Sequence, residues 1–388
     1  MMVAARPAAV IVGVEINGLG ILRSLALDRV PLIAADVDPR QPAMRTRHGR
    51  KFKLRAFAGL ELVDDLLALA STLDQRPALF VTRDETVATV SAHREILAKH
   101  YRFQLPPPDI ATALNTKAGF QRLAGQGGFP IPPGVHITRE ADLPKLAALP
   151  YPCALKPGER NEVYDRQFAK AYRVESAAEA EKLCRSILPV MPDLLVQQWI
   201  EGGDDAIYFV LQYHPSGGRA PLSFTGRKAH AWPILVGPTA RCGPAPEAAS
   251  LLEPLTTRFL QGCGLEGWGA MEYKRDARDS RWLMVEPTVG RSDMQIEIAT
   301  LNGVNLPLAA YRWLIGEEPP PPQSRPYTLW RRDWLADTAA ARAQPKVGRW
   351  PPANAPVADG FWRRDDPLPA LYAYPPRALG AVWRRLVR

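Results

Sequence analysis

Apolar positions in the first hundred residues fall into short continuous runs that alternate with longer runs of helical period. The short runs predict buried strands, and the longer runs predict helices. In chain order the pattern predicts strand 8–14, helix 19–28, strand 31–35, helix 60–73, strand 78–82 and helix 84–99. Strands that alternate with helices are typical of a parallel α/β sheet. Three prolines at 106–108 end the pattern, so we predict a first α/β domain over residues 1–109.

Two polar features of this domain bear on its function. Gly13, Gly18 and Gly20 follow the first strand without the spacing of a GxGxxG motif, so a nicotinamide cofactor is not favoured. The stretch Thr82–Glu85 has the spacing of a capping box, which begins a helix. Alternatively, the N-terminus of that helix holds a substrate anion. The sequence leaves both interpretations open.

Residues 110–316 mix strands and helices in a less regular order, which is typical of an α+β domain. In chain order the pattern predicts a helix capped by Asn115 or Thr116, strand 151–156, a polar loop 159–167, strand 168–174, helix 176–187, strand 194–200, a long strand to 213, a hairpin of strands 268–274 and 281–286, and closing helices 292–300 and 304–314. A proline run at 319–322 follows, so we predict a second domain over 110–316 and an extension over 317–388.

The predicted hairpin carries one carboxylate on each strand, Glu272 on the first and Glu286 on the second. Antiparallel pairing brings the two strands together, and two carboxylates on one face are costly unless a cation lies between them. Magnesium, which takes one or two protein carboxylates together with phosphate oxygens and water, suits this arrangement. A surface hairpin with two solvated acids is the alternative interpretation.

Lys117 indicates an anionic partner. It lies in the first turn of the helix that begins after Asn115 or Thr116, where a cation opposes the helix dipole. Since that position has no structural advantage for a lysine, we infer that an anion binds there. A second lysine, Lys156, ends a predicted strand and is followed by Pro157.

Composition narrows the function classes. The chain has 388 residues, of which 46% are hydrophobic and 23% charged, as in ordinary globular proteins. No apolar run approaches the roughly 18 residues of a membrane span, and no signal peptide is evident. The four cysteines are scattered, so we expect reduced thiols in a cytoplasmic protein. Because the basic residues behind the net charge of +9 do not form tracts, an anionic substrate is favoured over nucleic acid.

These motifs together resemble those of the ATP-grasp superfamily. The resemblance rests on their order over residues 110–316: Lys117, the Lys156-Pro157 pair, the linker strand Gln197–Ile200 and the two-carboxylate hairpin. The opening α/β domain resembles the Rossmann-like pre-ATP-grasp domain of that family. The resemblance therefore implies a pre-ATP-grasp domain, a two-lobed ATP-grasp domain with the nucleotide between its lobes, and an irregular C-terminal extension.

The resemblance also assigns roles to particular residues. Lys117, Lys156 and Lys170 match groups that reach the nucleotide phosphates. Gln197, Gln198, Trp199 and Ile200 match the adenine-binding linker, and Asp204 falls where a carboxylate takes the ribose hydroxyls. Glu272, Glu286 and Thr288 match the ligands of Mg²⁺, of which we expect two ions. Arg291 matches the catalytic arginine that steadies the transferring phosphoryl group, and Lys156 shares that catalytic role.

The sequence departs from the family pattern at two places. The last metal motif is Glu286-Pro-Thr288-Val-Gly-Arg291, with threonine in place of the usual asparagine and one extra residue before the arginine. The loop after Lys156-Pro157 has no glycine from 159 to 170, where relatives have a glycine-rich flap. Arg160, Arg166 and Lys170 replace that flap with side chains, or else form a solvated basic loop.

Other parts of the chain indicate the substrates and surroundings. Arg227 and Lys228 are candidates for a substrate carboxylate or phosphate, whereas a lone His230 is more often structural. The extension 317–388 holds five of the ten tryptophans and paired arginines, and its last residues, 381–388, are a candidate for contact with an anionic membrane surface. The sequence does not indicate an oligomeric state.

The sequence therefore predicts an ATP-dependent carboxylate–amine ligase. In this reaction ATP activates a substrate carboxylate as an acyl phosphate, and an amine displaces phosphate to form an amide. The opening segment from Val12 to Leu25 looks most like the D-aspartate ligase and carbamoyl-phosphate-synthase-like branch, which implies an amino acid as one substrate. The alternatives are an ATP-binding protein without turnover and a carboxylase, although no Ala-Met-Lys-Met biotinyl motif is present.

Overall fold

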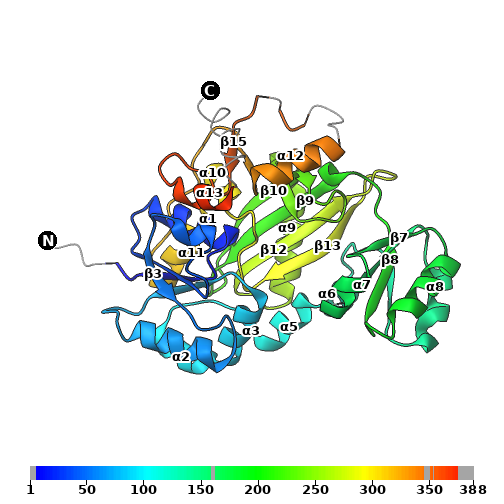
Figure 1. Ribbon diagram of the computed structural model, residues 1–388, viewed down its shortest axis with the longest axis horizontal. Coiled ribbons are helices and arrows are strands. Elements are labelled where there is room, and N and C mark those ends of the chain that lie inside the picture. Colours follow the sequence, from blue (N-terminus) through cyan, green and yellow to red (C-terminus); the bar gives the residue numbers. More distant parts are fainter. Residues whose placement is uncertain (1–5, 159–161, 345–349, 353, 375–388) are drawn as a thin grey trace. The chain divides into compact units, whose positions relative to one another are not determined.

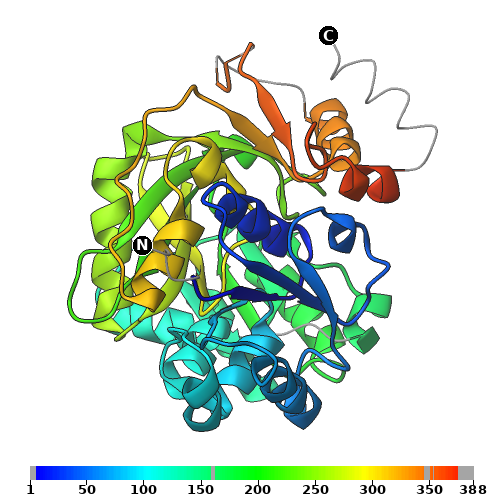
Figure 2. The same ribbon diagram turned by 90° about the vertical axis from the view of Figure 1, so that its left-hand side faces the viewer.

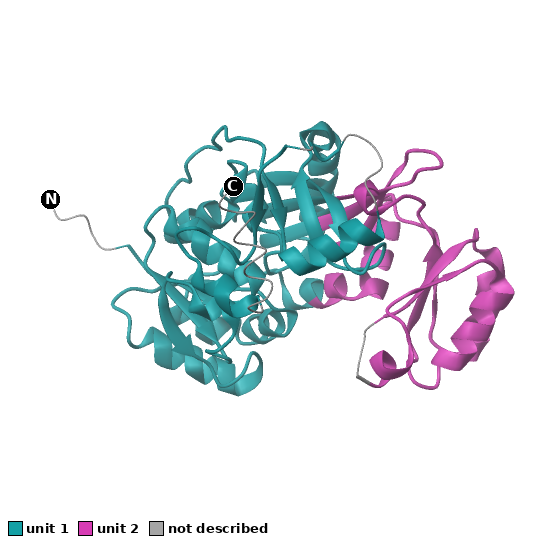
Figure 3. Ribbon diagram, turned by 45° about the horizontal axis from the view of Figure 1, so that its top comes forward, with its two compact units in different colours: residues 1–111, 209–270, 288–388 teal, residues 112–208, 271–287 magenta. Residues whose placement is uncertain are grey.

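The computed structural model describes residues 6–158, 162–344, 350–352 and 354–374. The chain divides into two compact units (Figure 3). Unit 1 comprises residues 1–111, 209–270 and 288–388, and unit 2 comprises residues 112–208 and 271–287. The units cut across the three predicted domains, because the segment 110–316 contributes to both units and the extension 317–388 falls in unit 1.

Unit 1 begins with a parallel four-stranded sheet in the order β3-β2-β1-β4. Its strands are β1 (Ala9–Val12), β2 (Leu32–Asp36), β3 (Arg50–Lys53) and β4 (Ala78–Val81). Helix α1 (Ile16–Ala26) lies on one face, and α2 (Gly59–Ala70) and α3 (Asp84–Ala92) lie on the other (Figures 1 and 2). Ala9 and Ile11 accordingly join one core, whereas Val10 and Val12 join another. The predicted βαβ alternation is confirmed.

Two predictions about this domain are wrong in detail. The single helix predicted over 84–99 is two helices, α3 and α4 (Arg94–His100), separated at His93. The stretch Thr82–Glu85 is not a capping box, because the N-cap of α3 is Arg83 and makes no side-chain cap. The Thr82 hydroxyl instead donates to the Gly13 carbonyl, at 2.7 Å. Gly13 has φ +85, and a Cβ there would lie 2.3 Å from the Thr82 hydroxyl oxygen, so this turn requires glycine.

Unit 2 contains an antiparallel sheet in the order β5-β8-β6-β7. The strands are β5 (Gly134–Ile137), β6 (Cys153–Pro157), β7 (Tyr172–Val174) and β8 (Leu194–Gln198). The helices are α6 (Lys117–Gln126), α7 (Glu162–Gln167) and α8 (Ala177–Ile187), with a 3₁₀ segment η2 (Glu140–Ala148) and a preceding helix α5 (Pro108–Asn115) that spans the unit boundary. Thr116, one of the two residues predicted to cap this helix, caps α6, and Ser176 caps α8.

The segment after β6 differs from its prediction. The expected polar loop 159–167 contains α7, and the expected strand 168–174 is only β7, so Lys170 precedes the strand. Tyr164 explains the difference, because its buried ring packs on Phe168 with centroids 5.3 Å apart. Its hydroxyl also donates to the Ala169 carbonyl, at 2.8 Å. A buried aromatic side chain thus organises a segment whose other residues are mostly polar.

The largest sheet has seven strands in the order β13-β12-β9-β10-β11-β14-β15. Its strands are β9 (Ile207–His214), β10 (Leu222–Ala231), β11 (Thr239–Pro244), β12 (Gly267–Arg275), β13 (Trp282–Val289), β14 (Leu329–Arg331) and β15 (Val357–Asp359). Three helices follow strands of this sheet along the chain: α9 (Pro246–Gly262), α10 (Glu297–Leu301) and α11 (Leu306–Ile315). The predicted two-carboxylate hairpin is β12 and β13, and the first closing helix begins at Glu297 and not at 292.

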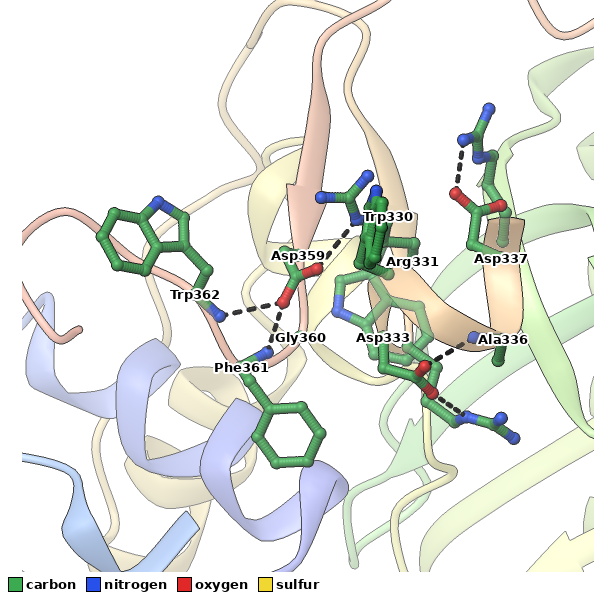
Figure 4. Close-up of polar contacts among 12 residues, drawn as sticks. Trp330, Arg331, Asp333, Ala336, Asp337, Asp359, Gly360, Phe361 and Trp362 are labelled. Carbon is green, nitrogen blue, oxygen red and sulfur yellow. Dashed lines mark hydrogen bonds and ion pairs between the residues drawn. The ribbon is translucent and has the colours of Figure 1, made fainter. Parts of the chain in front are cut away.

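The C-terminal extension is more regular than predicted. Its strand β14 pairs with β11, and β15 pairs with β14. The extension also contains α12 (Trp334–Ala343) and α13 (Leu368–Ala373). Asp359 accepts hydrogen bonds from the Phe361 and Trp362 amides at 3.0 and 2.9 Å and pairs with Arg331 at 2.8 Å (Figure 4). Polar contacts of this kind do not recur with a regular period, so the pattern of apolar positions could not predict these elements.

The sequence predicts reduced thiols from the scattered positions of the four cysteines. All four cysteines are free thiols, and three of them, Cys153, Cys184 and Cys242, are buried. Burial raises the pKa of Cys153 to about 11, so that thiol stays protonated near neutral pH. None of the helices among the described residues is long and apolar enough to cross a bilayer.

A buried ion pair fastens the extension to the first sheet within unit 1. Arg23 of α1 lies 3.0 Å from Asp366, and both side chains are almost fully buried. The Arg23 guanidinium also donates to the carbonyls of Gly360 and Phe361, at 2.7 and 2.8 Å. Asp366 in turn accepts from the Thr46 hydroxyl and the Arg47 amide, at 2.7 and 2.9 Å. Burial opposes the charge of Asp366, but these donors and Arg23 lower its pKa overall.

We expect Asp366→Asn to lower the free energy of unfolding by about 3 kcal/mol at pH 7, because it removes the hydrogen-bonded carboxylate of the buried Arg23 and leaves Glu297 as the other negative charge near it. Urea unfolding measures this difference. Since the folded-state pKa of Asp366 is lowered, its stabilisation is complete above the unfolded pKa of about 3.9 and is lost as the pH falls further. The gap between wild type and variant should therefore narrow below about pH 4.

Asp365→Asn is the matched control, because this neighbouring carboxylate is exposed. It should change the free energy of unfolding by no more than about 0.5 kcal/mol. Equal losses in the two variants would contradict the role assigned to the buried pair.

Candidate nucleotide site

Lys156 is the centre of the candidate site in unit 2. It lies on β6, and burial lowers the pKa of its ammonium group. The carboxylates of Glu286 and Glu272 raise that pKa, whereas the ammonium groups of Lys117 and Lys170 lower it further. The five residues come from α6, β6, the segment before β7, and the hairpin β12–β13. The structure thus brings together all five charged groups that the resemblance assigns to phosphate and metal.

Lys117 is held at the start of the loop that follows β6. It is the first residue of α6, and its ammonium donates to the Gly158 carbonyl at 2.7 Å. Gly158 also donates its amide to the Asp193 carbonyl at 2.8 Å, and a Cβ on Gly158 would overlap the Asp193 carboxylate. The Gly158 carbonyl therefore holds the Lys117 ammonium group. Without such a partner, a cation at the start of a helix would be unfavourable.

Lys170 is exposed and lies between α7 and β7, yet it is close enough to influence Lys156. Arg166, on α7, is also exposed. Arg160, the third cation predicted for this loop, lies outside the described residues. The described part of the segment is therefore a short helix and a bend that present basic side chains, where the family resemblance implies a glycine-rich flap.

The linker strand β8 places Gln197 and Gln198 where the sequence predicts adenine contacts. Gln197 is buried, and its amide oxygen accepts a long hydrogen bond of 3.4 Å from Gln121. Gly134 on β5 lies opposite Gln197, and a Cβ there would approach the Gln197 Cβ to 2.9 Å. The amide of Gln198 already donates to the Pro133 carbonyl at 2.8 Å. Gln197 therefore offers its side chain, whereas the Gln198 amide is used by the fold.

The residues after β8 form a cluster of charged groups around Trp199. Lys274, on β12, lies 5.4 Å from the centre of the Trp199 ring, and Arg173 lies 5.3 Å from it. Arg173 pairs with Glu201 at 3.1 Å. Such cations over an aromatic ring stabilise its orientation. Trp199 is thus fixed by its neighbours and is itself half-buried.

Asp204 does not lie where a ribose can reach it in this structure. It is fully buried at the start of the 3₁₀ segment η3 (Asp204–Ala206). Its charge raises the pKa of Lys274, a group whose pKa is lowered overall by burial. The neighbouring Asp205 is partly exposed. Asp204 therefore acts as a buried counter-ion of Lys274, a lysine that the sequence analysis missed because strand alternation alone does not mark it.

Glu272 and Glu286, the two carboxylates that the sequence predicts as metal ligands, lie on the two strands of the hairpin. Glu286 is exposed and Glu272 is partly exposed. Among the described residues no three histidines, cysteines, aspartates or glutamates gather as a metal-ligating group. Two carboxylates without a third acidic ligand fit Mg²⁺, which keeps several waters and binds phosphate oxygens, better than a metal that needs a full protein cage.

Thr288 and Arg291 follow these ligands and belong to unit 1. Thr288 is on β13 and partly exposed. The Arg291 guanidinium makes two hydrogen bonds to Asp84, of 2.5 and 3.1 Å, at the first residue of α3. A bidentate pair of this kind orients the planar guanidinium. The acidic residue that begins α3 thus positions an arginine, and the sequence did not link the two because 207 residues separate them.

Arg227 and Lys228 point to opposite faces of β10, as neighbours on a strand do. Lys228 is buried opposite Cys242 of β11 and lowers the pKa of that thiol, which burial raises. The Arg227 guanidinium lies 4.5 Å from the centre of the Trp350 ring. His230 contacts Asp337, with 3.1 Å between Nδ1 and the carboxylate. Within unit 1 the two candidate substrate residues are therefore separated.

Comparisons with known proteins identify the fold. Neither the protein-family models nor the curated protein sequences gave a match. Solved structures did match, with TM-scores above 0.6 at low sequence identity. N5-carboxyaminoimidazole synthetase from Staphylococcus aureus in complex with ADP has a TM-score of 0.63 and 11% identity, over 81% of this chain and 78% of that chain.

Two further structures have similar scores. Biotin carboxylase from Campylobacter jejuni, in a β-γ-ATP complex, has a TM-score of 0.63 and 16% identity, over 82% of this chain and 73% of that one. N5-carboxyaminoimidazole synthase from Aspergillus clavatus, with ADP and 5-aminoimidazole ribonucleotide, has a TM-score of 0.60 and 17% identity, over 82% and 79%. These matches show that the chain has the ATP-grasp fold.

We expect Lys156→Met to weaken ATP binding by roughly tenfold to a hundredfold, since it removes one charged hydrogen bond to phosphate. The melting temperature should stay the same or rise, because the variant removes a desolvated ammonium near two other lysines. Titration calorimetry with ATP and magnesium, together with thermal unfolding, measures both effects.

Lys182→Met is the matched control, because Lys182 is an exposed lysine of α8 in the same unit. It should leave ATP affinity unchanged. Unaltered affinity in the Lys156 variant, or an equal loss in the control, would exclude Lys156 from the phosphate site.

Proposed function

We propose that this chain, which has the ATP-grasp fold, is an ATP-dependent ligase that joins a carboxylate to an amine. The reaction would release ADP and phosphate and form an amide bond. The observation that carries the proposal is the group of three lysines and two glutamates around Lys156 in unit 2. The lysines suit the negative charges of a polyanionic ligand, and the glutamates suit the cations bound to that ligand.

ATP is the proposed nucleotide, and each part of it has a candidate partner. Lys117, Lys156 and Lys170 would hold the phosphates as flexible point charges. The Gln197 side chain, whose bond from Gln121 is long, would accept from the adenine amino group, and Trp199 with Ile200 would flank the ring. For the ribose hydroxyls we propose Asp205 in place of the buried Asp204.

Magnesium fits the hairpin carboxylates, and we propose that Glu272, Glu286 and Thr288 hold two ions. A threonine hydroxyl ligates Mg²⁺ in other phosphoryl-transfer proteins, so it is an acceptable third ligand. When bound, the ions would neutralise negative charge on the phosphates. The chain's own contribution is to hold two glutamate carboxylates next to Lys156. The proposed metal ligands and the proposed phosphate-binding lysine would then share one site.

Catalysis would depend on positioning and charge. A carboxylate oxygen of the substrate attacks the γ-phosphorus of ATP, the bond to the β-phosphate oxygen breaks, and the products are an acyl phosphate and ADP. Arg291, oriented by Asp84, would stabilise the charge on the transferring group. An amine then attacks the acyl carbon, phosphate leaves and the amine gives up a proton. No side-chain nucleophile is required, because binding supplies the orientation.

An amino acid is the substrate class that the resemblance favours for one of the two substrates. Arg227 is the proposed group for its carboxylate, because Arg227 is partly exposed whereas Lys228 is buried. The rival function is ATP binding without turnover, which the threonine in the metal motif motivates. A screen for phosphate release over amino acids, small acids, bicarbonate and amines separates the two. Phosphate released only when an acid and an amine are both present supports the ligase.

We expect ATP to raise the melting temperature more than GTP when magnesium is present, because Gln197 presents an acceptor to the adenine amino group. Differential scanning fluorimetry at matched nucleotide concentrations measures the two shifts. Gln197→Ala should make the shifts similar. Equal shifts with the wild-type protein would contradict the linker assignment.

We expect Glu286→Gln to reduce turnover by roughly a hundredfold or more, because it removes a charge that matters most in the transition state. The substitution keeps the side-chain volume and one oxygen. ATP binding should survive in this variant. Thr288→Asn, which introduces the usual ligand of the family, should remain active. Steady-state phosphate release with the substrates found in the screen measures both rates.

Asp279→Asn is the control, because it neutralises an exposed carboxylate at the tip of the same hairpin. It should turn over at close to the wild-type rate. If Glu286→Gln also turned over at the wild-type rate, the proposed metal site would be wrong.

A further inference from the structure

The segment from residue 45 to 55 concentrates positive charge, against the expectation that basic residues do not form tracts. It contains no acidic residue and carries Arg45, Arg47, Arg50, Lys51, Lys53 and Arg55. The segment runs from the end of η1 (Pro42–Arg45) through β3, which is the edge strand of the first sheet. Arg47, Arg50, Lys51 and Lys53 are exposed. Arg55 forms an ion pair with Asp65 at 2.7 Å, so we assign it a structural role.

Helix α13 presents apolar side chains next to these cations. Leu368, Leu371 and Tyr372 have spacings of three and four residues, which place them on one face, and they are 46%, 47% and 56% exposed. The opposite face of α13 already packs against the protein, because Pro369 and Ala370 are buried. The exposed face is therefore not needed to hold α13 on the molecule.

The helix and the basic segment are in contact within unit 1. The Arg45 guanidinium lies 4.6 Å from the centre of the Tyr372 ring, and the Arg47 guanidinium donates to the Asp365 carbonyl at 3.0 Å. Figures 1 and 2 both show α13, in red, beside the blue N-terminal part of the chain. Arg50 lies on the other face of β3, because it pairs with Ile33 of the α2-side core, whereas Lys51 pairs with Ala34 of the α1-side core. We define the basic–apolar patch as Arg47, Lys51 and Lys53 together with Leu368, Leu371 and Tyr372.

Protection of a sheet edge explains only part of this patch. Lysines and arginines on an edge strand discourage pairing with other chains, which accounts for Lys51 and Lys53. It does not account for three exposed apolar side chains on the adjacent helix, since exposed apolar groups promote association. The combination of both kinds of side chain requires a partner that is anionic and also has an apolar interior.

We propose that the basic–apolar patch binds the surface of an anionic lipid bilayer. Phospholipid headgroups attract the cations, and Leu368, Leu371 and Tyr372 enter the boundary between headgroups and acyl chains. A nucleic acid offers phosphates but has no apolar medium for the two leucines. The sequence beyond α13 has the same character, with Arg377, Arg384, Arg385 and Trp383 and no acidic residue after Asp366. Those residues, including the predicted contact segment 381–388, lie outside the described part of the chain.

Sedimentation with lipid vesicles tests the proposal on the full-length chain. The probe is a phosphatidylcholine vesicle with about 30% phosphatidylserine, compared with phosphatidylcholine alone, at low salt and at about 0.5 M salt. We expect binding only to the anionic vesicles and loss of binding at high salt. The double variant Lys51→Glu with Lys53→Glu should reduce the partition coefficient at least about tenfold. The double variant Leu368→Gln with Leu371→Gln should reduce it by a similar factor.

Two control variants separate the patch from other surfaces. Leu60→Gln with Leu251→Gln changes two exposed leucines on α2 and α9, and it should bind vesicles like the wild type. Arg384→Gln with Arg385→Gln tests the tail. The variants in the patch and on α2 and α9 should keep the wild-type melting temperature, because the changed side chains are exposed.

Three outcomes would overturn the proposal. The first is an absence of binding to anionic vesicles. The second is binding that depends on Arg384 and Arg385 but not on the patch. The third is binding to duplex DNA or RNA that falls in the Lys51 and Lys53 variant and is unchanged in the leucine variant, which would identify a nucleic-acid surface instead. None of these outcomes bears on ATP binding, so the ligase proposal stands or fails separately.

Discussion

The charge balance around Lys156 is the constraint on which the candidate site depends. Burial disfavours its ammonium, and two other lysines disfavour it further. Glu272 and Glu286 are the groups that compensate, and both come from one hairpin that is remote in sequence. Three lysines and two glutamates give these five side chains a net positive charge. A site of this kind is therefore expected to bind a polyphosphate more tightly when its metal ions are present.

Backbone contacts place the charged side chains at this site. The Gly158 carbonyl receives Lys117, and Gly134 allows β5 to approach Gln197 closely. Both positions exclude a Cβ, since one would meet the Asp193 carboxylate and the other would meet the Gln197 side chain. Because these constraints act on the main chain, they persist when side chains reorient around a ligand. Main-chain atoms of β5 and of the residue after β6 thus constrain Gln197 and Lys117, the residues proposed for adenine and phosphate.

Local patterns predicted much of the fold. The opening βαβ alternation, the helix cap at Thr116 and the hairpin with Glu272 and Glu286 all depend on neighbours in sequence, and the structure confirms them. The predictions fail where distant residues decide. The predicted polar loop forms α7 because the Tyr164 ring is buried there against Phe168. The Thr82 hydroxyl donates to the Gly13 carbonyl and does not cap a helix. Strands β14 and β15 were missed because each is only three residues long.

The candidate site residues also divide into those that the sequence could identify and those that it could not. Lys117, Lys156, Gln197 and the two glutamates could be assigned because the family resemblance fixes their order along the chain. Lys274 and Asp84 could not, because their roles arise from partners far away: Lys274 is balanced by the buried Asp204, and Asp84 orients Arg291. A buried carboxylate also looks the same in sequence as one that meets a ribose. Burial is therefore the property that moves the ribose assignment from Asp204 to Asp205, and only a three-dimensional structure supplies it.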